Sequence, residues 1–522
     1  MTSDDAQPDM PDVASEAPSD QILAPLSLPA DAGPAAAAWP LGRLRDPGTP
    51  LTRSAAWIAT IVLVALTVLM QAGVVGLGTA EGKADDAVEK AKGPLAPNPV
   101  FTLQARFLVA ASGALSRKAG ADDADDVDES GSNAALAAIA PLRSAAQGSP
   151  EDTLHLAIVE GEIVGPSAAL DTLDEVVAQD TAAPAWLHDD AASLRTIYGA
   201  GGADALTDAQ RKGLLERHGW FGRLALTFGK APNDPARARA LGAARRASVA
   251  LATLTALATG GVIAGLVLLV LVGVGYSHGR LRSAYSRPAP GGSVFLETFA
   301  LFLVAFLALS SIAGVVEATT GVAVTPILMW LILPVAFWPM ARGVSWDAWR
   351  HAAGWHRGRG VLREIGAGVI GYVAGLPVLA LGIGLTLALI QLWSLLAPAG
   401  EAGGGAGPVH PIVGEAQGAT AAQIASIYLL GVVWAPIVEE TFFRGCLFHH
   451  LRGKLSPVLA SLVVGFIFAV IHPQGILAVP AIASLGFVFS MIREWRGSII
   501  ANATAHALNN AVLLTTVVVA LR

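Results

Sequence analysis

The sequence predicts an all-α fold: a polytopic membrane helical bundle of about nine spans, with a helical extramembrane domain between the first and second spans. Three observations support this. The chain has 522 residues, 53% of them hydrophobic and only 14% charged. Its mean hydropathy is +0.55. Apolar runs, each about as long as a membrane helix, follow one another through its second half. Soluble chains are more charged, so we expect a multi-pass integral membrane protein.

The charge balance narrows the classes of partner. The formal net charge is -7, and acidic residues concentrate in the first third of the chain. Nucleic acid is therefore not expected as a partner. The only cysteine is Cys446, which excludes an internal disulfide framework.

Composition divides the chain into five regions. Residues 1–50 are rich in Ala, Pro, Asp and Ser and predict a disordered tail. Residues 51–80 hold the first membrane helix, 81–246 an extracytoplasmic helical domain, 247–400 membrane helices, and 401–522 a membrane core that carries unusual polar residues. After the first span, the apolar runs cover residues 248–276, 294–316, 322–341, 365–397, 421–450, 457–472, 475–492 and 498–520. Within the extramembrane domain, Thr207 and Gln210 have the spacing of a capping box.

Positive charges in the short loops predict the orientation. With a cytoplasmic N-terminus, each short loop expected on the cytoplasmic side contains Arg or Lys, and the loops expected outside contain neither. The arginines at 237–246 are the one departure from this pattern. We therefore expect a cytoplasmic N-terminus, residues 81–246 outside, and the plasma (inner) membrane of a bacterium as the location.

Polar side chains interrupt the last apolar runs. Counting from the basic loops at about 1.5 Å per residue places them at similar depths, about 15 to 24 Å from the cytoplasmic side. They are Glu439, Glu440, Arg444, His472, His506 and Asn510. Convergence on three helices predicts a site within the membrane.

Spacing suggests a division of roles between the two glutamates. Glu440 and Arg444 are four residues apart and can pair on one helix face. Glu439 points about 100° away from that face. The pair would position the site, and the unpaired carboxylate of Glu439 could act as the general base that takes a proton from water.

The two histidines could complete such a site. His472 directly precedes Pro473, so its ring is expected at a helix end, where it could hold the same water. His506 and Asn510 are four residues apart, and together they could donate hydrogen bonds to a developing oxyanion.

Three motifs resemble those of a known family. "EETFFR" is similar to a Glu-Glu-x-x-x-Arg motif, "FAVIH" to Phe-x-x-x-His, and "HALNN" to His-x-x-x-Asn, in the order found in CaaX protease and bacteriocin-processing (CPBP, type II CaaX prenyl endopeptidase-like) intramembrane proteases. The resemblance covers about the last 160 residues. It implies hydrolysis of peptide bonds within the membrane, with water activated by Glu439 and His472, support from Glu440 and Arg444, and an oxyanion site at His506 and Asn510.

The sequence does not decide whether the site requires a metal. The family is often described as metalloproteases, yet a glutamate-activated water needs no metal. The chain has no His-Glu-x-x-His motif. If a metal such as Zn²⁺ is present, Glu439, His472 and His506 could furnish three ligands. We favour the metal-free interpretation.

Two other functions fit intramembrane charges. A transporter or proton relay also uses Glu, His and Arg within the membrane, although paired interrupted helices in two halves are typical of transporters and here the polar set lies only in the last quarter. An inactive scaffold would bind a partner through the outer domain. For the protease, a membrane-embedded or membrane-anchored peptide is the expected substrate, and the lipid bilayer is the surrounding partner.

Overall fold

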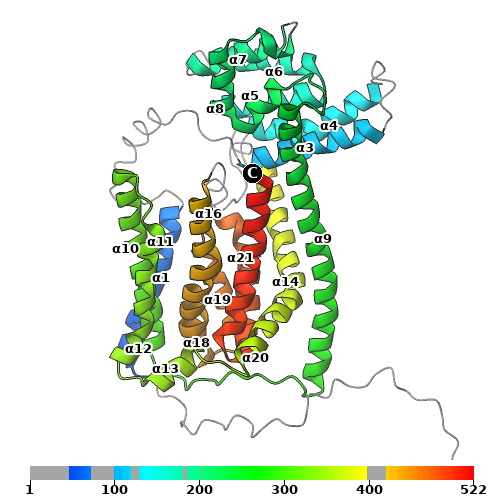
Figure 1. The fold of residues 1–522 in the computed structure, drawn as a ribbon. Coiled ribbons are helices and arrows are strands. Elements are labelled where there is room, and N and C mark those ends of the chain that lie inside the picture. Colours follow the sequence, from blue (N-terminus) through cyan, green and yellow to red (C-terminus); the bar gives the residue numbers. More distant parts are fainter. Residues whose placement is uncertain are drawn as a thin grey trace, which may run out of the picture. The chain divides into compact units, whose positions relative to one another are not determined.

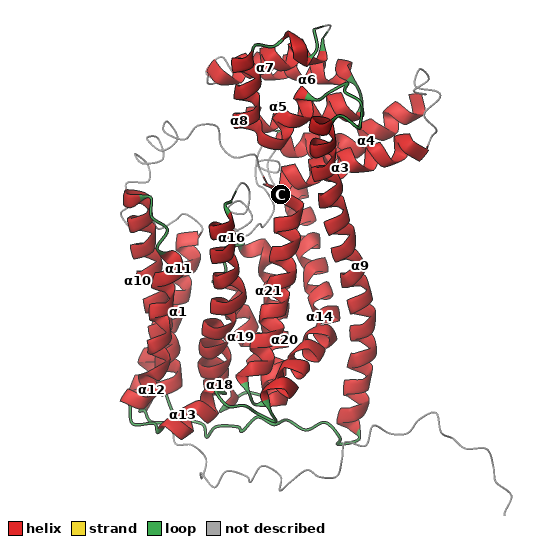
Figure 2. Ribbon diagram, viewed as in Figure 1, coloured by secondary structure: helices red, strands yellow, loops and turns green. Residues whose placement is uncertain are grey.

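The computed structural model describes residues 46–71, 99–118, 129–147, 149–179, 185–199, 201–396 and 419–521. Every regular element in these ranges is a helix, and none is a strand (Figure 2). The all-α prediction is thus confirmed for the part of the chain described. The predicted tail, residues 1–50, lies almost entirely outside these ranges.

Within the described residues, seven helices are long and apolar enough to cross a membrane. They are α1 (Pro50–Gln71), α9 (Pro235–Ser277), α10 (Val294–Thr320), the segment Val361–Trp393 of α14 (Val361–Leu396), the continuous segment Ala421–Arg452, the segment Ile476–Arg496 that contains α20 (Val479–Arg496), and α21 (Ile499–Leu521). The prediction of a multi-pass membrane protein agrees with this arrangement. Figure 1 shows the long helices side by side.

Two of the predicted spans form shorter apolar helices. The run at 322–341 becomes Thr325–Ala341, made of α11 (Thr325–Leu328), the 3₁₀ segment η2 (Met329–Phe337) and α12 (Trp338–Ala341). The run at 457–472 becomes α19 (Pro457–Val470), whose 14 residues extend about 21 Å. The hydrocarbon core is about 30 Å thick. The structure therefore supports seven spans by length, and nine stays a prediction.

The region predicted as an extramembrane domain is helical wherever it is described. Its helices are α3 (Pro99–Lys118), α4 (Glu129–Ala146), α5 (Pro150–Ile163), α6 (Pro166–Gln179), α7 (Ala185–Tyr198), the short η1 (Ala203–Ala205) and α8 (Asp208–Leu226). They share one apolar core. The capping box of Thr207 and Gln210 is present at the start of α8 and confirms that prediction. Burial lowers the pKa of His155 in this core to about 4, so its ring is neutral at pH 7.

Helix α9 joins this domain to the membrane bundle. It has 43 residues and extends about 65 Å. Ala240 and Ala244 near its start belong to the extramembrane core, and its later part packs against α14 and α21 (Figure 1). The boundary predicted at 246 therefore falls inside one continuous helix. The change from polar to apolar composition does not end the helix there, because arginine is a good helix former.

The basic loops meet at one end of the bundle. Arg452 pairs with Glu494 at 2.8 Å, and Arg496 pairs with Glu364 at 2.7 Å. Tyr285 Oη lies 2.8 Å from His449 Nδ1. Because these contacts join the ends of α14, α18 (Phe448–Arg452) and α20 to the segment after α9, the loops that the sequence placed on one side of the membrane do lie together.

Close packing of α19 on α20 depends on two glycines. A Cβ added at Gly465 would lie 2.6 Å from the carbonyl oxygen of Ala483, and one added at Gly486 would lie 2.6 Å from Gly465 Cα. Side chains at these positions would hold the helices apart. The approach matters for the site, because α19 leads into His472 and the carbonyl of Gly486 binds Arg444.

We predict that Gly465→Ala lowers the free energy of unfolding by about 1–3 kcal/mol, the usual effect of overpacking. The measurement is thermal unfolding of the purified protein in one detergent. Gly314→Ala in α10 is the matched control, since a Cβ there meets nothing within 4 Å. Equal effects of the two substitutions would contradict the close contact of α19 and α20.

Candidate active site

The two glutamates lie at a change of helix type. The segment Ala421–Arg452 contains α16 (Ala421–Tyr428), a π-helical stretch η3 (Leu429–Trp434), α17 (Ala435–Glu439), a second π-helical stretch η4 (Glu440–Leu447) and α18. In η4 the backbone N–H of Phe448 donates to the carbonyl of Phe443, five residues earlier. π-Helical turns are rare and are frequent at functional sites. Glu439 ends α17 and Glu440 begins η4.

Glu440 is the centre of a buried hydrogen-bond network. Its Oε1 accepts from Arg444 Nη1 at 3.0 Å and from His506 Nδ1 at 2.9 Å. Its Oε2 accepts from Asn502 Nδ2 at 2.6 Å. The side chains of Glu440 and Arg444 are fully buried. The Glu440–Arg444 ion pair that the spacing suggested is therefore formed. The hydrogen bonds of Glu440 to Asn502 and His506 also hold α21 against η4.

Arg444 is enclosed by aromatic rings. Its guanidinium carbon lies 4.7 Å from the centroid of Phe468, 5.4 Å from Phe489 and 5.7 Å from Phe443. Its Nη2 donates to the carbonyl of Gly486 at 2.9 Å. The cation is thus held by one carboxylate, one carbonyl and the faces of rings, which attract cations.

Glu439 faces two imidazoles. Its Oε2 lies 3.9 Å from His506 Nε2 and 4.0 Å from His472 Nε2. This oxygen is buried and has no hydrogen-bond partner among the described residues. The structure therefore brings Glu439, His472 and His506 together around one carboxylate oxygen, from three separate helical segments.

Hydrogen bonds at Nδ1 orient both rings. His472 follows the end of α19, and its Nδ1–H donates to the carbonyl of Phe468. His506 Nδ1–H donates to Glu440, and Phe489 stacks on its ring with centroids 5.0 Å apart. Each ring consequently turns Nε2 towards Glu439. The assignment of the protons follows from the acceptors, since a carbonyl and a carboxylate cannot donate.

Asn510 lies one turn away from this cluster. Its Nδ2 donates to the carbonyl of Gly431 at 2.7 Å, and its Oδ1 accepts from Asn509 at 3.1 Å. Through this hydrogen bond to Gly431, Asn510 holds α21 against the π-helical stretch η3. Its expected role as an oxyanion donor stays a prediction.

Asn502 is a site residue that the sequence reasoning missed. It is fully buried and bonded to Glu440. Its signal was the spacing of "NATAHALNN", in which Asn502 precedes His506 by four residues and so shares its helix face.

The donor set of Glu439, His472 and His506 is of the type that binds zinc, but its spacing is wide. Zinc ligands lie about 2.0–2.2 Å from the metal, which places them about 3.4 Å from one another. Glu439 Oε2 lies 3.9 and 4.0 Å from the two imidazole nitrogens, but the ligand atoms of the three residues do not all lie within 4.8 Å of one another. Within the described residues, the one cluster whose ligand atoms all lie within 4.8 Å is Glu151, His155 and His218, outside the bundle. We therefore derive no step that needs a metal at Glu439.

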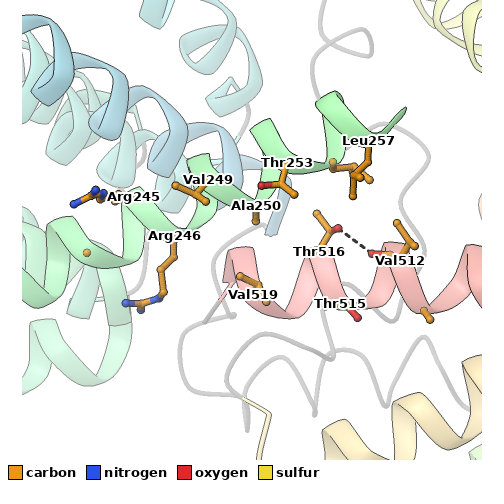
Figure 3. Close-up of a pocket in the computed structure, with 13 residues that line it drawn as sticks. Arg245, Arg246, Val249, Ala250, Thr253, Leu257, Val512, Thr515, Thr516 and Val519 are labelled. Atoms are coloured by element: carbon orange, nitrogen blue, oxygen red, sulfur yellow. Dashed lines mark hydrogen bonds between the residues drawn. The ribbon is translucent and has the colours of Figure 1, made fainter. Parts of the chain in front are cut away.

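A separate cavity of about 630 Å³ lies between α9 and α21 (Figure 3). Apolar and threonine side chains line it, with Arg245 and Arg246 at one end. None of the six predicted site residues lines this cavity, although Ala511 in its wall directly follows Asn510. It borders the helix that carries His506 and is distinct from the Glu439 cluster.

Fold and site together define a helical membrane protein in which two candidate spans and the segment after α19 bring a glutamate and two histidines together. Residues 421–512 match the family model of Type II CAAX prenyl endopeptidase Rce1-like proteins, so the chain carries a domain of this family of CAAX-type proteases. All six predicted site residues lie within the matched range. No curated protein and no solved structure matches the chain.

We predict that Arg444→Leu lowers the free energy of unfolding by about 3–5 kcal/mol, because it leaves the buried carboxylate of Glu440 without its cation. Arg342→Leu is the matched control. Its pair with Glu297 is partly exposed, and such pairs contribute about 1 kcal/mol or less. Unfolding of both variants in the same detergent measures the difference, and similar losses would show that Glu440 does not depend on Arg444.

Proposed function

We propose that the protein is an intramembrane endopeptidase that hydrolyses peptide bonds of membrane-associated or lipidated substrates. The observation that carries this proposal is the buried Oε2 of Glu439, which has no hydrogen-bond partner and faces the Nε2 atoms of His472 and His506. The Rce1-like domain supports the same reaction class.

The reaction begins with a water held between Glu439 and His472. The carboxylate of Glu439 accepts one proton from this water, while the oxygen attacks the carbonyl carbon of the peptide bond. Donation of Nδ1–H to Phe468 leaves a lone pair on His472 Nε2, which can accept the second hydrogen of the water as a hydrogen bond. Both groups thus orient the attacking oxygen.

The tetrahedral intermediate carries a negative oxygen that needs donors. A His506 protonated on both nitrogens donates Nδ1–H to Glu440 and offers Nε2–H to the oxyanion. In the intermediate Glu439 holds the proton from water and is neutral, so the two negative charges of Glu440 and the oxyanion balance the two positive charges of Arg444 and His506. Collapse of the intermediate breaks the C–N bond, and Glu439 passes its proton to the leaving amine.

The basic loops support an orientation in which this chemistry takes place inside the membrane, about 15 to 24 Å from the cytoplasmic side. The loops that meet around Arg452 and Arg496 are basic, as expected for cytoplasmic loops. Residues 81–246 are then extracytoplasmic, the N-terminus is cytoplasmic, and the membrane is the plasma membrane of a bacterium. The alternative role, a transporter or proton relay, has less support, because Glu440 and Arg444 are fully buried and bonded to each other.

We predict that Glu439→Gln lowers cleavage of a membrane-tethered reporter peptide by about 10²–10⁴-fold, the usual contribution of a general base. His472→Ala should also lose cleavage. The assay compares purified variants reconstituted in lipid vesicles. Glu317→Gln is the matched control, since Glu317 is another glutamate of a membrane helix and bonds only to the turn at Val324 and Thr325 among the described contacts.

If Glu439→Gln and His472→Ala both cleave the peptide as fast as the wild type, the protease assignment is wrong. A parallel reaction with a chelator tests whether cleavage requires a bound metal. Loss of activity that zinc restores equally in Glu151→Gln, which alters the second histidine–carboxylate cluster, would give Glu439, His472 and His506 the role of ligands, and a bound metal would then supply Lewis-acid activation of the water. Unchanged activity would support a glutamate-activated water alone.

A further inference from the structure

A second group of histidines and carboxylates lies in the extramembrane domain, away from the membrane cluster. Glu151 and His155 are four residues apart on α5, His218 lies on α8, and Asp190 lies on α7. Both imidazoles are fully buried within an otherwise apolar core. Polar groups at such positions need partners, so their arrangement calls for an explanation.

Three potential ligands converge in this core. His155 Nε2 lies 3.0 Å from His218 Nδ1. One ligand atom from each of Glu151, His155 and His218 lies within 4.8 Å of the other two. Two imidazoles and a carboxylate are a frequent ligand set for zinc, and two ligand nitrogens around one zinc ion lie about 3.4 Å apart. The spacing therefore needs only a small adjustment to hold a metal.

A carboxylate binds one of the two imidazoles and another lies near the second. His218 Nε2–H donates to Asp190 at 3.0 Å, and Asp190 is held in turn by Arg217. His155 Nδ1 lies 3.9 Å from Asp152 Oδ1. In metal sites, the second nitrogen of a ligating histidine almost always donates to a carboxylate, a carbonyl or water. Asp190 already leaves the lone pair of His218 on Nδ1, the atom that faces His155.

Two polar atoms of the cluster lack hydrogen-bond partners. They are Oε1 of Glu151 and Nδ1 of His155, and both are buried. Stacking of His155 on Phe221, with ring centroids 4.3 Å apart, accounts for the burial of the ring. It does not account for a buried carboxylate oxygen that has no donor beside it among the described residues, which is unfavourable.

The backbone of α8 bends at this point. Gly219, directly after His218, has φ 52° and ψ -109° and interrupts the helix. Positive φ is readily adopted only by glycine. The interruption allows His218 and Phe221 both to face α5, where they contact His155.

We propose that Glu151, His155 and His218 form a binding site for a divalent transition metal ion of the zinc type, with Asp190 and Asp152 as the supporting carboxylates. The metal links α5 to α8, which are distant in sequence, and stabilises the extramembrane domain. Its role is structural, and the site does not depend on the proposed protease function.

The test measures metal on the full-length protein in detergent. The protein is stripped with a chelator, titrated with ZnCl₂, separated from free metal and analysed for bound zinc by mass spectrometry. We expect one tightly bound equivalent in the wild type and its loss in His155→Gln and in Glu151→Gln. His188→Gln is the matched control, because His188 lies on α7 of the same domain outside the cluster.

A further variant separates this site from the membrane cluster. Glu439→Gln/His472→Ala should retain the equivalent and the rise in melting temperature that zinc produces. A histidine variant can lose zinc simply because it does not fold, since His155 is fully buried. Glu151 lies at the edge of the core, so Glu151→Gln is expected to fold and to report on zinc binding alone. Absence of tightly bound zinc in the wild type, its retention in Glu151→Gln, or its loss in Glu439→Gln/His472→Ala would each overturn the proposal.

Discussion

The carboxylate of Glu440 is the constraint on which the arrangement of the candidate site depends. A charged group at the centre of a bilayer costs about 2.5–3.5 kcal/mol on insertion scales, so it must be compensated by neighbours. Glu440 receives hydrogen bonds from Arg444, Asn502 and His506, which use both of its oxygens. Two of these donors lie on α21, so satisfying one charge also fixes how α21 packs on the glutamate-bearing helix.

This network explains the different state of the neighbouring glutamate. Because consecutive residues of a helix point about 100° apart, Glu439 cannot share the partners of Glu440. The Nδ1 of His506 is committed to Glu440, so only its Nε2 faces Glu439. One glutamate is thus satisfied and structural, while the other retains a carboxylate oxygen available for chemistry.

Local spacing predicted those parts of the site that lie within one helix. The Glu440–Arg444 pair followed from four-residue spacing, and the place of His472 followed from the proline after it. Spacing could not show that Asn510 bonds to Gly431, because that contact depends on how α21 packs against η3. Nor could it join Glu151 and His155 to His218, since 63 residues separate the two histidines.

The fold contributed two features that hydropathy alone does not contain. Apolar content predicts that a segment is buried in lipid, but the helix type of η4 and the length of α19 depend on tertiary contacts. Contact between Gly465 and Gly486 brings α20 close to α19, and the carbonyl of Gly486 then reaches Arg444. Backbone packing and the charged network are therefore linked at Gly486, which lies against Gly465 of α19 and accepts a hydrogen bond from Arg444 through its carbonyl.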